Sequence, residues 1–430
     1  YTLFRLRQRF LQAPLYLLKC TLTNPASQVK KVLTLIPSHT GAKPVKPQFP
    51  ANFEDLERSG IGIIAVQGFG MEGLYPLWFG EGSEATPKVI RDACIEALDQ
   101  GETFYNIPRG RAELRNALKV YHDTLYSIDL HPDRIHVPGS TMLTVIIAAH
   151  MVLRPGDHAV IVTPHWPNVE MAMKWAGAEV SHFRQNSGNG KWALNLDGLM
   201  AACSPDTKMI YLNSPCNPTG YVMERPDQER LMDFCRSRGI VLLADEVYHR
   251  TVYDRNYAPS FLEFAGDDDP LILVNGFSKG WAMTGWRLGW MVTPKAYEEQ
   301  MAVLSEIYNT GAPSFIQLGA IAALEKGETA LDGLRQGYKE SLIVANEILG
   351  GHPRIEHTAP EGAFYAFPRI KGIDDGLKFA EGLLFDAKVG VAPGYTFGPE
   401  NETHIRLCFA MKADRLEEAL HAFTRYLDQT

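Results

Sequence analysis

From about residue 130 onward, short runs of apolar residues alternate with longer segments in which apolar residues recur at helical spacing. Each run is apolar throughout instead of alternating, which is typical of a strand buried on both faces of a sheet. Residues 225–239, between two of the runs, predict a helical crossover, because Leu231 and Phe234 follow helical spacing and Gly239 can end the helix. Crossovers of this kind make most of a sheet parallel. The runs predict strands within residues 158–164, 208–215, 239–248, 271–279 and 286–294.

The pattern changes beyond residue 315. Residues 316–351 predict one long helix, and residues 362–370 and 402–410 predict strands with alternating polarity. This combination indicates a second, smaller α+β domain, with the segment around residues 50–80 folded back beside it. We therefore expect an α/β fold whose large domain has a mostly parallel sheet between helices. The expected boundaries are 80–310 for the large domain, 51–79 with 311–430 for the small domain, and 1–50 for a basic N-terminal arm.

The composition favours a globular enzyme over a protein that binds nucleic acid or membranes. Hydrophobic residues make up 45% of the chain and charged residues 21%, which is ordinary for a well-packed globular protein. The net charge of -8 provides no attraction for polyanions, and no run of about 20 apolar residues predicts a membrane span. We expect small-molecule partners, with no nucleic acid and no membrane.

The first 53 residues contain lysine and arginine but no acidic residue before Glu54. Arginine interleaved with phenylalanine and leucine, without acid, can indicate an organellar transit peptide. A basic arm or a non-native extension would have the same composition. The cysteines show no CxxC spacing, so the sequence indicates neither a metal site nor a disulfide framework. A reducing cytoplasm fits this usage, or an organellar matrix if the segment is a transit peptide. The six cysteines are Cys20, Cys94, Cys203, Cys216, Cys235 and Cys408.

Polar and aromatic residues follow four of the predicted strands. Open α/β sheets bind ligands at the carboxyl ends of their strands, so these positions are candidates for a binding site. These positions after the strands carry an acid, an amine, a phenol, an amide and an aromatic plate. Together these groups indicate one kind of ligand. The residues are Trp166, Asn217, Asp245, Tyr248 and Lys279.

Asp245 and Lys279 carry the chemistry of this set. An acid at the end of a buried strand is penalised by desolvation, so Asp245 needs a cationic partner, such as a protonated pyridine nitrogen, or several donors. The alternative for Asp245 is a helix cap or an ion pair with arginine. A lysine in an apolar pocket has a lowered pKa, and its neutral amine is a nucleophile that can form an imine. The alternative for Lys279 is a solvated loop lysine.

Arg287 and the turn around Gly139 are candidates for binding an anion. The forked guanidinium of Arg287 suits a phosphate or a carboxylate. Gly139 permits a close approach of the backbone, and Ser140 and Thr141 open a predicted helix whose first N–H groups can bind a phosphate. A simple helix cap is the alternative reading of this turn.

The residues together carry a family resemblance. From about residue 55 to the C-terminus, the chain resembles the fold-type I pyridoxal-phosphate enzymes of the class I/II aminotransferase group. That resemblance implies a seven-stranded type of sheet in the large domain and pyridoxal 5'-phosphate as the cofactor. The matching segments are "TPHWPNV", "NSPCNPTG", "ADEVY", "SKGWAMTGWRLGW", "GAFYAF" and "IRLCFA", in the order of the family.

The resemblance implies a role for each strand-exit residue. Lys279 would form the internal aldimine and then move the proton between the substrate α-carbon and the cofactor. Asp245 would keep the pyridine nitrogen protonated, which makes the ring an electron sink. Asn217 and Tyr248 would donate hydrogen bonds to the phenolic oxygen of the cofactor. Trp166 would stack on the face of the ring.

The phosphate of the cofactor would be held by Arg287 and by the turn at Ser140 and Thr141, with Ser278 as a further contact. Many relatives carry a phosphate-binding serine three residues before the lysine. The present chain has Gly276 at that position, so that contact is either absent or replaced.

Substrate binding and assembly follow from the same resemblance. Arg406 would form a bidentate pair with the substrate α-carboxylate, Asn217 would contact the substrate, and Gly80 would line its pocket. Tyr105 would reach the phosphate of the cofactor in a neighbouring subunit, which implies a homodimer with shared active sites. Cys216, beside Asn217, would be either sensitive to oxidation or a buried, inert thiol.

The expected activity is the transfer of an amino group from an L-amino acid to a 2-oxo acid by a ping-pong mechanism, within amino acid metabolism. Aspartate specificity is not assured, because no arginine lies between Arg287 and Arg335 and Thr141 occupies a position where some relatives have lysine. Arg109 is a candidate for binding a distal carboxylate, with a structural arginine as the alternative. Three residues could favour apolar or aromatic substrates or could be packing residues: Trp78, Phe79 and Tyr308.

Two other functions compete with this one. A carbon-sulfur β-lyase uses the same scaffold, and the motifs above do not separate it from an aminotransferase. A transcription regulator that senses pyridoxal phosphate would need a winged-helix DNA-binding module before the domain. The segment before residue 51 is too short and too interrupted by proline for such a module.

Overall fold

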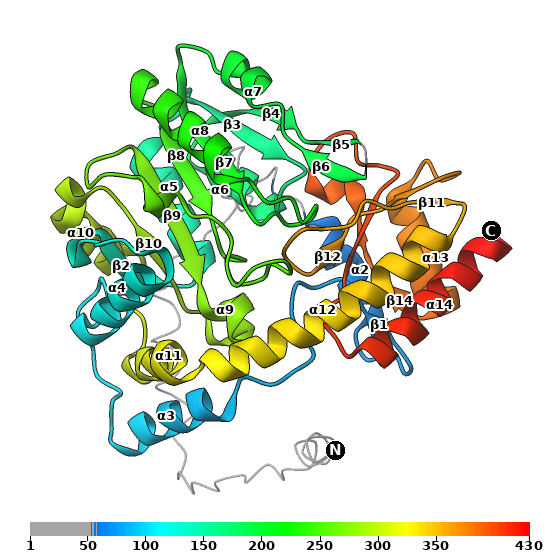
Figure 1. Cartoon of the computed structure of the whole chain (residues 1–430), viewed down its shortest axis with the longest axis horizontal. Helices are drawn as coiled ribbons and strands as arrows, with labels where there is room; N and C mark the ends of the chain where they lie inside the picture. Colours follow the sequence, from blue (N-terminus) through cyan, green and yellow to red (C-terminus); the bar gives the residue numbers. More distant parts are fainter. Residues whose placement is uncertain (1–52, 54–55, 57, 189) are drawn as a thin grey trace, which may run out of the picture. The chain divides into compact units, whose positions relative to one another are not determined.

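A seven-stranded mixed sheet forms the centre of the fold (Figure 1). Its strand order is β2-β10-β9-β8-β7-β3-β4, and only the two pairings of β10 are antiparallel. This confirms the expected α/β class and the mostly parallel sheet. The strands are β2 (Ile135–Gly139), β3 (His158–Thr163), β4 (Glu179–Arg184), β7 (Thr207–Asn213), β8 (Val241–Asp245), β9 (Leu271–Gly276) and β10 (Gly289–Val292).

The description rests on a computed structural model. It describes residues 53, 56, 58–188 and 190–430. The contacts within the chain separate residues 1–54 from residues 55–430, and the second unit contains the seven-stranded sheet. The basic arm expected over residues 1–50, with its transit-peptide reading and Cys20, lies outside the described residues.

Both faces of the sheet are covered by helices, which explains why its strands are apolar throughout. Along β7, Ile210 and Leu212 belong to one apolar core, and Met209 and Tyr211 belong to the other. The first core is completed by α3 (Lys88–Asp99), α4 (Ala112–Tyr126), α7 (Leu196–Ala202), α8 (Arg225–Arg238) and α11 (Ser314–Lys326). The second is completed by α5 (Thr141–Val152), α6 (Pro167–Trp175) and α10 (Glu298–Asn309).

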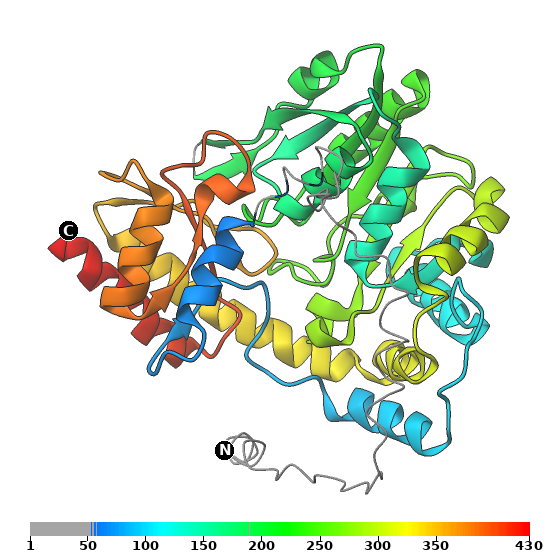
Figure 2. The same cartoon turned by 180° about the vertical axis from the view of Figure 1, so that it is seen from behind.

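A third core lies around three small sheets beside the large one (Figures 1 and 2). Tyr75 pairs with Val389 in parallel, so the segment before residue 80 folds back beside the C-terminal part, as expected. The domain boundaries themselves stay a prediction. The strands are β1 (Tyr75–Pro76), β11 (Ile355–Glu356), β12 (Tyr365–Ala366), β13 (Arg369–Ile370), β14 (Val389–Gly390), β15 (Ala392–Pro393) and β16 (Ile405–Cys408), and the helices are α2 (Gly60–Gly68), α12 (Glu328–Gly351), α13 (Gly376–Ala387) and α14 (Ala413–Gln429).

The remaining elements are short. None of the helices among the described residues is long and apolar enough to cross a membrane. The short elements are the hairpin strands β5 (Asn186–Gly188) and β6 (Lys191–Ala193), the helix α9 (Phe277–Gly280), and the 3-10 turns η2 (Pro132–Arg134), η3 (Phe261–Glu263), η4 (Thr284–Trp286), η5 (Lys295–Tyr297) and η6 (Gly394–Phe397).

Two expectations about elements were wrong. The single helix expected over 316–351 is two helices, α11 and α12, which break at Gly327. A Cβ atom on Gly327 would lie 2.3 Å from the carbonyl oxygen of Ala323, so only glycine fits this junction. Arg287 was expected on a strand, but β10 begins at Gly289. Arg287 instead ends the turn η4 with a left-handed φ of 55°.

Candidate active site

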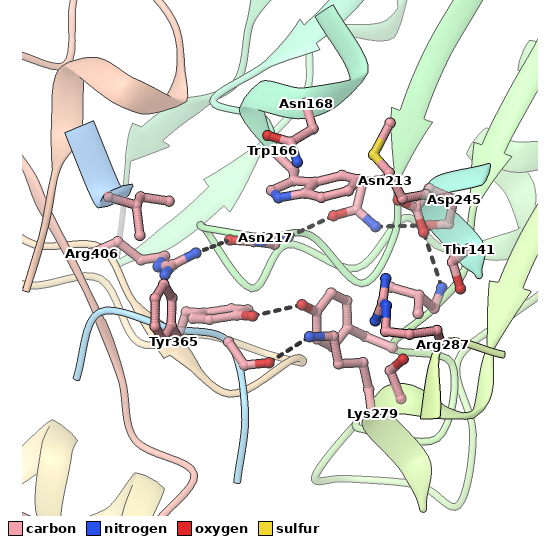
Figure 3. A pocket seen from close by; sticks show the side chains of 17 residues that line it. Thr141, Trp166, Asn168, Asn213, Asn217, Asp245, Lys279, Arg287, Tyr365 and Arg406 are labelled. Carbon is pink, nitrogen blue, oxygen red and sulfur yellow. Dashed lines mark hydrogen bonds between the residues drawn. The ribbon is translucent and has the colours of Figure 1, made fainter. Parts of the chain in front are cut away.

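A pocket of about 280 Å³ lies at the carboxyl ends of the parallel strands. Its wall also includes Ile61 from α2, Tyr365 from β12 and Arg406 from β16, so parts of the chain far apart in sequence close it (Figure 3). Ten residues expected at the site line this pocket. They are Gly80, Thr141, Trp166, Asn217, Asp245, Tyr248, Ser278, Lys279, Arg287 and Arg406.

Lys279 lies on α9, directly after the end of β9. Lys279 as a whole is half-buried, because part of its side chain lines the pocket. Its amine, however, is enclosed by protein. The amine donates a hydrogen bond to the carbonyl oxygen of Gly80 at 2.5 Å and lies 5.7 Å from the centre of the Tyr248 ring. Burial lowers the pKa of Lys279 to about 8. The geometry therefore favours the nucleophilic amine over the solvated loop lysine.

Asp245 is the last residue of β8 and is only 4% exposed. Its carboxylate accepts hydrogen bonds from the Tyr211 hydroxyl at 3.0 Å and from the Val247 backbone N–H at 3.2 Å. Burial raises the pKa of Asp245 to about 6. Within the described residues, the carboxylate has no arginine partner and caps no helix, so neither alternative for Asp245 applies.

Arg406 is buried at the side of the pocket opposite Arg287 and Thr141 in Figure 3. Its guanidinium donates to the Asn217 side-chain oxygen at 3.2 Å and to the carbonyl oxygen of Trp78. The buried Nε atom of Arg406 has no hydrogen-bond partner in the described part of the chain. Because the oxygen of Asn217 is used by Arg406, its amide N–H groups are left to donate into the pocket.

The Tyr248 hydroxyl lies 2.6 Å from the hydroxyl of Tyr365. The Tyr365 ring also packs under the Arg406 guanidinium, 4.6 Å from its central carbon. A Cβ atom on Gly80 would lie 1.9 Å from the Tyr365 hydroxyl. Gly80 therefore lines the pocket as expected, and its missing side chain leaves room for Tyr365 beside Lys279.

The opposite end of the pocket combines Arg287, Thr141 and Ser278. Arg287 is exposed and donates to the Thr284 carbonyl oxygen at 2.7 Å. Thr141 is the first residue of α5 and donates to the Asn275 carbonyl oxygen at 3.0 Å. The N-terminus of α5 and one cation thus lie together, which suits an anion.

Two residues expected at the cofactor do not line the pocket. Ser140 caps α5 by accepting a hydrogen bond from the Leu143 N–H at 3.2 Å, which is the helix-cap alternative for this turn. Tyr105 is 91% exposed and lies away from this pocket. An exposed position agrees with a role in a neighbouring subunit, and that role stays a prediction.

Arg109 has a structural role. It is 8% exposed, forms ion pairs with Asp133 at 3.2 Å and with Glu298, and does not line the pocket. The structure therefore favours the structural alternative over the binding of a distal carboxylate. Cys216 is buried, and burial raises the pKa of its thiol to about 11, which agrees with an inert thiol.

Of the three aromatic residues considered for substrate specificity, one lines the pocket and two do not. Phe79 lines the pocket, whereas Trp78 contributes only its carbonyl oxygen, to Arg406, and Tyr308 hydrogen-bonds to His150 away from the site. Sequence reasoning gave no side-chain role to six further lining residues, although Tyr365 and Asn213 stand in segments that carry the resemblance. These residues are Ile61, Met142, Asn168, Asn213, Val247 and Tyr365.

The family of the chain is decided by comparison with known sequences. A sequence model of the family "Aminotransferase class I and II" matches residues 77–423. The chain belongs to the class I and II aminotransferases. This family uses pyridoxal phosphate, so the enzyme is an aminotransferase with that cofactor, as the resemblance implied.

Two similar proteins support the membership of the chain in this family. The aspartate aminotransferase of Pyrococcus abyssi is 35% identical, over 83% of this chain and 92% of its own. The aromatic-amino-acid aminotransferase 2 of Thermococcus litoralis is 34% identical, over 84% of this chain and 93% of its own.

A solved structure also matches the fold. The aspartate aminotransferase of Thermus thermophilus with maleate is 26% identical, with a TM-score of 0.82 over 88% of this chain and 100% of its own. The seven-stranded fold implied by the resemblance is therefore confirmed.

The residues of the pocket fit pyridoxal phosphate. An enclosed amine suits the aldehyde of the cofactor, and Trp166 offers a flat face for its ring. The buried carboxylate of Asp245, which forms no ion pair among the described residues, suits a protonated ring nitrogen. Arg287 and the N-terminus of α5 suit the phosphate.

Proposed function

We propose that the enzyme transfers an amino group from an L-amino acid to a 2-oxo acid in two half-reactions, with Lys279 as the residue that binds the cofactor and moves the proton. The single observation that carries this proposal is the position of the enclosed Lys279 amine in one pocket with Asp245 and Arg406. An acid, an amine and a guanidinium on different sides of one small cavity can bind three different parts of a cofactor and its substrate.

When bound, pyridoxal phosphate supplies a ring that withdraws electrons from the substrate α-carbon. The carboxylate of Asp245 would hold a proton at the ring nitrogen, where an opposite charge would compensate its burial. Tyr248 and the free amide N–H of Asn217 would donate to the phenolic oxygen. Trp166 would pack against the ring and exclude water from one face.

Lys279 is suited to act as an acid and a base in turn. Because burial lowers its pKa to about 8, both its neutral and its protonated form are accessible near neutral pH. The neutral amine would take the proton from the substrate α-carbon. The protonated amine would then return it at the carbon that joins the cofactor to the amino group.

Arg406 is suited to bind the α-carboxylate of the substrate. Its present partners are the neutral oxygens of Asn217 and Trp78, and its Nε is unpaired. A carboxylate would form two parallel charge-assisted hydrogen bonds with the guanidinium, which are stronger than bonds to neutral oxygens. The Tyr365 ring below the guanidinium fixes its plane.

We propose aspartate and the aromatic amino acids as the donors to test first, with 2-oxoglutarate as the acceptor. The named relatives support both classes of donor. Phe79 and Ile61 line the pocket and can pack against an apolar side chain. The cations that line it are Lys279, Arg287 and Arg406, each with a proposed role, so a distal carboxylate finds no further cation among the described lining residues.

We also propose that two copies of the chain assemble with shared active sites. Tyr105 is 91% exposed, and Phe104 beside it is 84% exposed. An aromatic pair exposed to this extent can pack against a second subunit. The molar mass in solution, measured by light scattering, tests the assembly. The variant Tyr105→Phe tests the shared site, because it should have the molar mass of the unchanged enzyme but bind the cofactor more weakly.

The reaction can be tested by single half-reactions of the purified holoenzyme. Each amino acid in a panel is added alone, and the visible absorption of the cofactor is followed. We expect aspartate or an aromatic donor to convert the cofactor to its amine form and 2-oxoglutarate to reverse the change. Release of pyruvate and ammonia from cystathionine without any 2-oxo acid would instead establish the β-lyase alternative.

A further inference from the structure

A second cluster of polar side chains lies next to the pocket but does not line it. It consists of His165 after β3, Glu170 on α6 and His182 on β4. Strands β3 and β4 are parallel neighbours, and Ile161 pairs with His182. The helix α6 connects the two strands, so it brings Glu170 to the two histidines from the same crossover.

The ligand atoms of this cluster converge. Nε2 of His165 lies 3.2 Å from Oε2 of Glu170, and Nε2 of His182 lies 3.1 Å from the same oxygen. All three atoms lie within 4.8 Å of one another. The two imidazole rings are nearly parallel, with centroids 5.7 Å apart. Two imidazoles and a carboxylate therefore face one small volume.

His165 provides the second observation. It is 1% exposed, and neither of its ring nitrogens forms a hydrogen bond of acceptable geometry within the described part of the chain. Its Nε2 is close to the Glu170 oxygen, but the two are not aligned as donor and acceptor. A buried polar group without a partner costs about 1–3 kcal/mol. A cation bound by Nε2 of His165 and by the Glu170 oxygen would remove the part of this cost that falls on Nε2.

We propose that His165, Glu170 and His182 bind a divalent transition-metal ion of the zinc class. Zn²⁺ prefers imidazole nitrogen and carboxylate oxygen at about 2.0–2.2 Å, in a tetrahedral arrangement. Ligand atoms at that radius are separated by about 3.3 Å, which is close to the two separations that involve Glu170. His182 is on the exposed side, so it can rotate toward the ion, and water can take the fourth position.

Lys174 sets the strength of this site. Its ammonium lies 2.7 Å from Oε1 of Glu170, whereas both histidines lie near Oε2. A positive charge at that distance opposes the binding of a cation by repulsion. Lys174 is 55% exposed in its side chain, so removing its charge changes the site without opening the core. Lys174→Gln should therefore bind the metal more tightly than the unchanged enzyme.

The site is distinct from the cofactor pocket, although Trp166 directly follows His165 in the chain and lines that pocket. Metal binding does not depend on the proposed transfer reaction, so it can be tested without measuring turnover. Zn²⁺ titration by calorimetry gives the affinity, and Co²⁺ absorption reports the coordination number and the ligands. The protein should be the full-length holoenzyme without a histidine tag.

We expect one Zn²⁺ to bind per chain, with Co²⁺ giving the visible bands of a four- or five-coordinate ion. His182→Ala should weaken binding by more than about 100-fold, and Lys174→Gln should strengthen it. His182 is exposed, so this variant should fold, whereas His165→Ala tests the buried ligand at greater risk to the fold. The control is His421→Ala, which removes an exposed histidine 3.8 Å from Glu417 and should leave the affinity unchanged.

Three outcomes would overturn the proposal. The first is the absence of Zn²⁺ binding at millimolar concentration. The second is an affinity that His182→Ala leaves unchanged. The third is a Co²⁺ spectrum typical of a six-coordinate, weakly bound ion that is identical in the unchanged enzyme and in His182→Ala.

Discussion

Thr141 occupies the space that a side chain on Gly276 would need. A Cβ atom on Gly276 would lie 2.2 Å from the Thr141 hydroxyl oxygen and 3.4 Å from the Leu288 carbonyl oxygen. The Thr141 hydroxyl itself is held by a hydrogen bond to the Asn275 carbonyl oxygen. A serine at position 276 would therefore clash with threonine at 141.

This relationship predicts a coupled pair of substitutions. Gly276→Ser alone should lower the free energy of unfolding by about 1–3 kcal/mol, the usual cost of overpacking, and should weaken cofactor binding. Thr141→Ala removes the hydroxyl that clashes, so the double variant should recover most of that stability. Urea denaturation of all four proteins measures the coupling. Strictly additive effects would show that the two positions do not compete for space.

The amine of Lys279 should react as a base of unusually low pKa. In the apoenzyme, burial lowers its pKa from 10.5 to about 8, so the fraction of neutral amine should rise through pH 8. The rate of reductive methylation at Lys279, measured by mass spectrometry of its peptide, should rise with a midpoint near that pH. Peptides with exposed lysines in the same sample serve as the reference. A midpoint near 10.5 would contradict the enclosed environment of the amine.

Replacement of Lys279 should separate cofactor binding from catalysis. Lys279→Ala should retain pyridoxal phosphate through the other pocket residues but lose about 10²–10⁴-fold in turnover, since no general acid or base remains. Borohydride treatment should leave a stable pyridoxyl group on residue 279 of the unchanged enzyme and none on this variant. Lys295→Ala, which removes an exposed lysine, is the matched control. Near-normal turnover of Lys279→Ala would exclude the proposed role.

Asp245→Asn should stabilise the apoenzyme and weaken catalysis. Because the folded pKa of Asp245 is raised from 3.8 to about 6, the folded state binds more protons than the unfolded state between these values, and stability falls as pH rises through that window. Above pH 6 the full penalty applies, on the order of 2–3 kcal/mol. The variant removes it, so its urea midpoint should exceed that of the unchanged apoenzyme at pH 7 but not at pH 4.

The same variant should lower the kcat of the holoenzyme by about 10- to 100-fold, through loss of one charge-assisted hydrogen bond. Equal stability of the two apoenzymes at pH 7 would argue against a carboxylate that is buried without a cation.

Arg406→Lys should raise the KM for every amino acid donor. Lysine keeps the charge but cannot form two parallel hydrogen bonds with a carboxylate. The loss should be about 2 kcal/mol or more in kcat/KM, or at least ~30-fold. Arg369→Lys, at an exposed arginine on β13 that pairs with Glu356, should leave KM unchanged. An unchanged KM in Arg406→Lys for all donors would mean that another residue binds the α-carboxylate.

The residues that follow the buried strands could be predicted from the sequence. A buried strand is a continuous apolar run, and the first polar residue marks its end. Asp245 and Lys279 were found in this way. Tyr365 and Ile61 were not found, because they reach the pocket from β12 and α2. The approach of those elements depends on packing between distant segments, which has no local signature.

The cluster of His165, Glu170 and His182 has no signal in the sequence for a related reason. His165 and His182 are separated by a whole crossover, and no short spacing marks them as a pair. Arg287 was misplaced because the apolar residues on both sides of it gave the pattern of a strand. Its left-handed backbone, with a φ of 55°, leaves no trace in that pattern.

The left-handed backbone of Arg287 has a consequence for engineering. A residue other than glycine, asparagine or aspartate in this backbone region costs roughly 1 kcal/mol or more. The Arg287 side chain nevertheless lines the anion end of the pocket. A screen that rewards heat tolerance alone would therefore favour glycine or asparagine at this position. The variants selected by such a screen would be more stable to heat but would bind the cofactor more weakly.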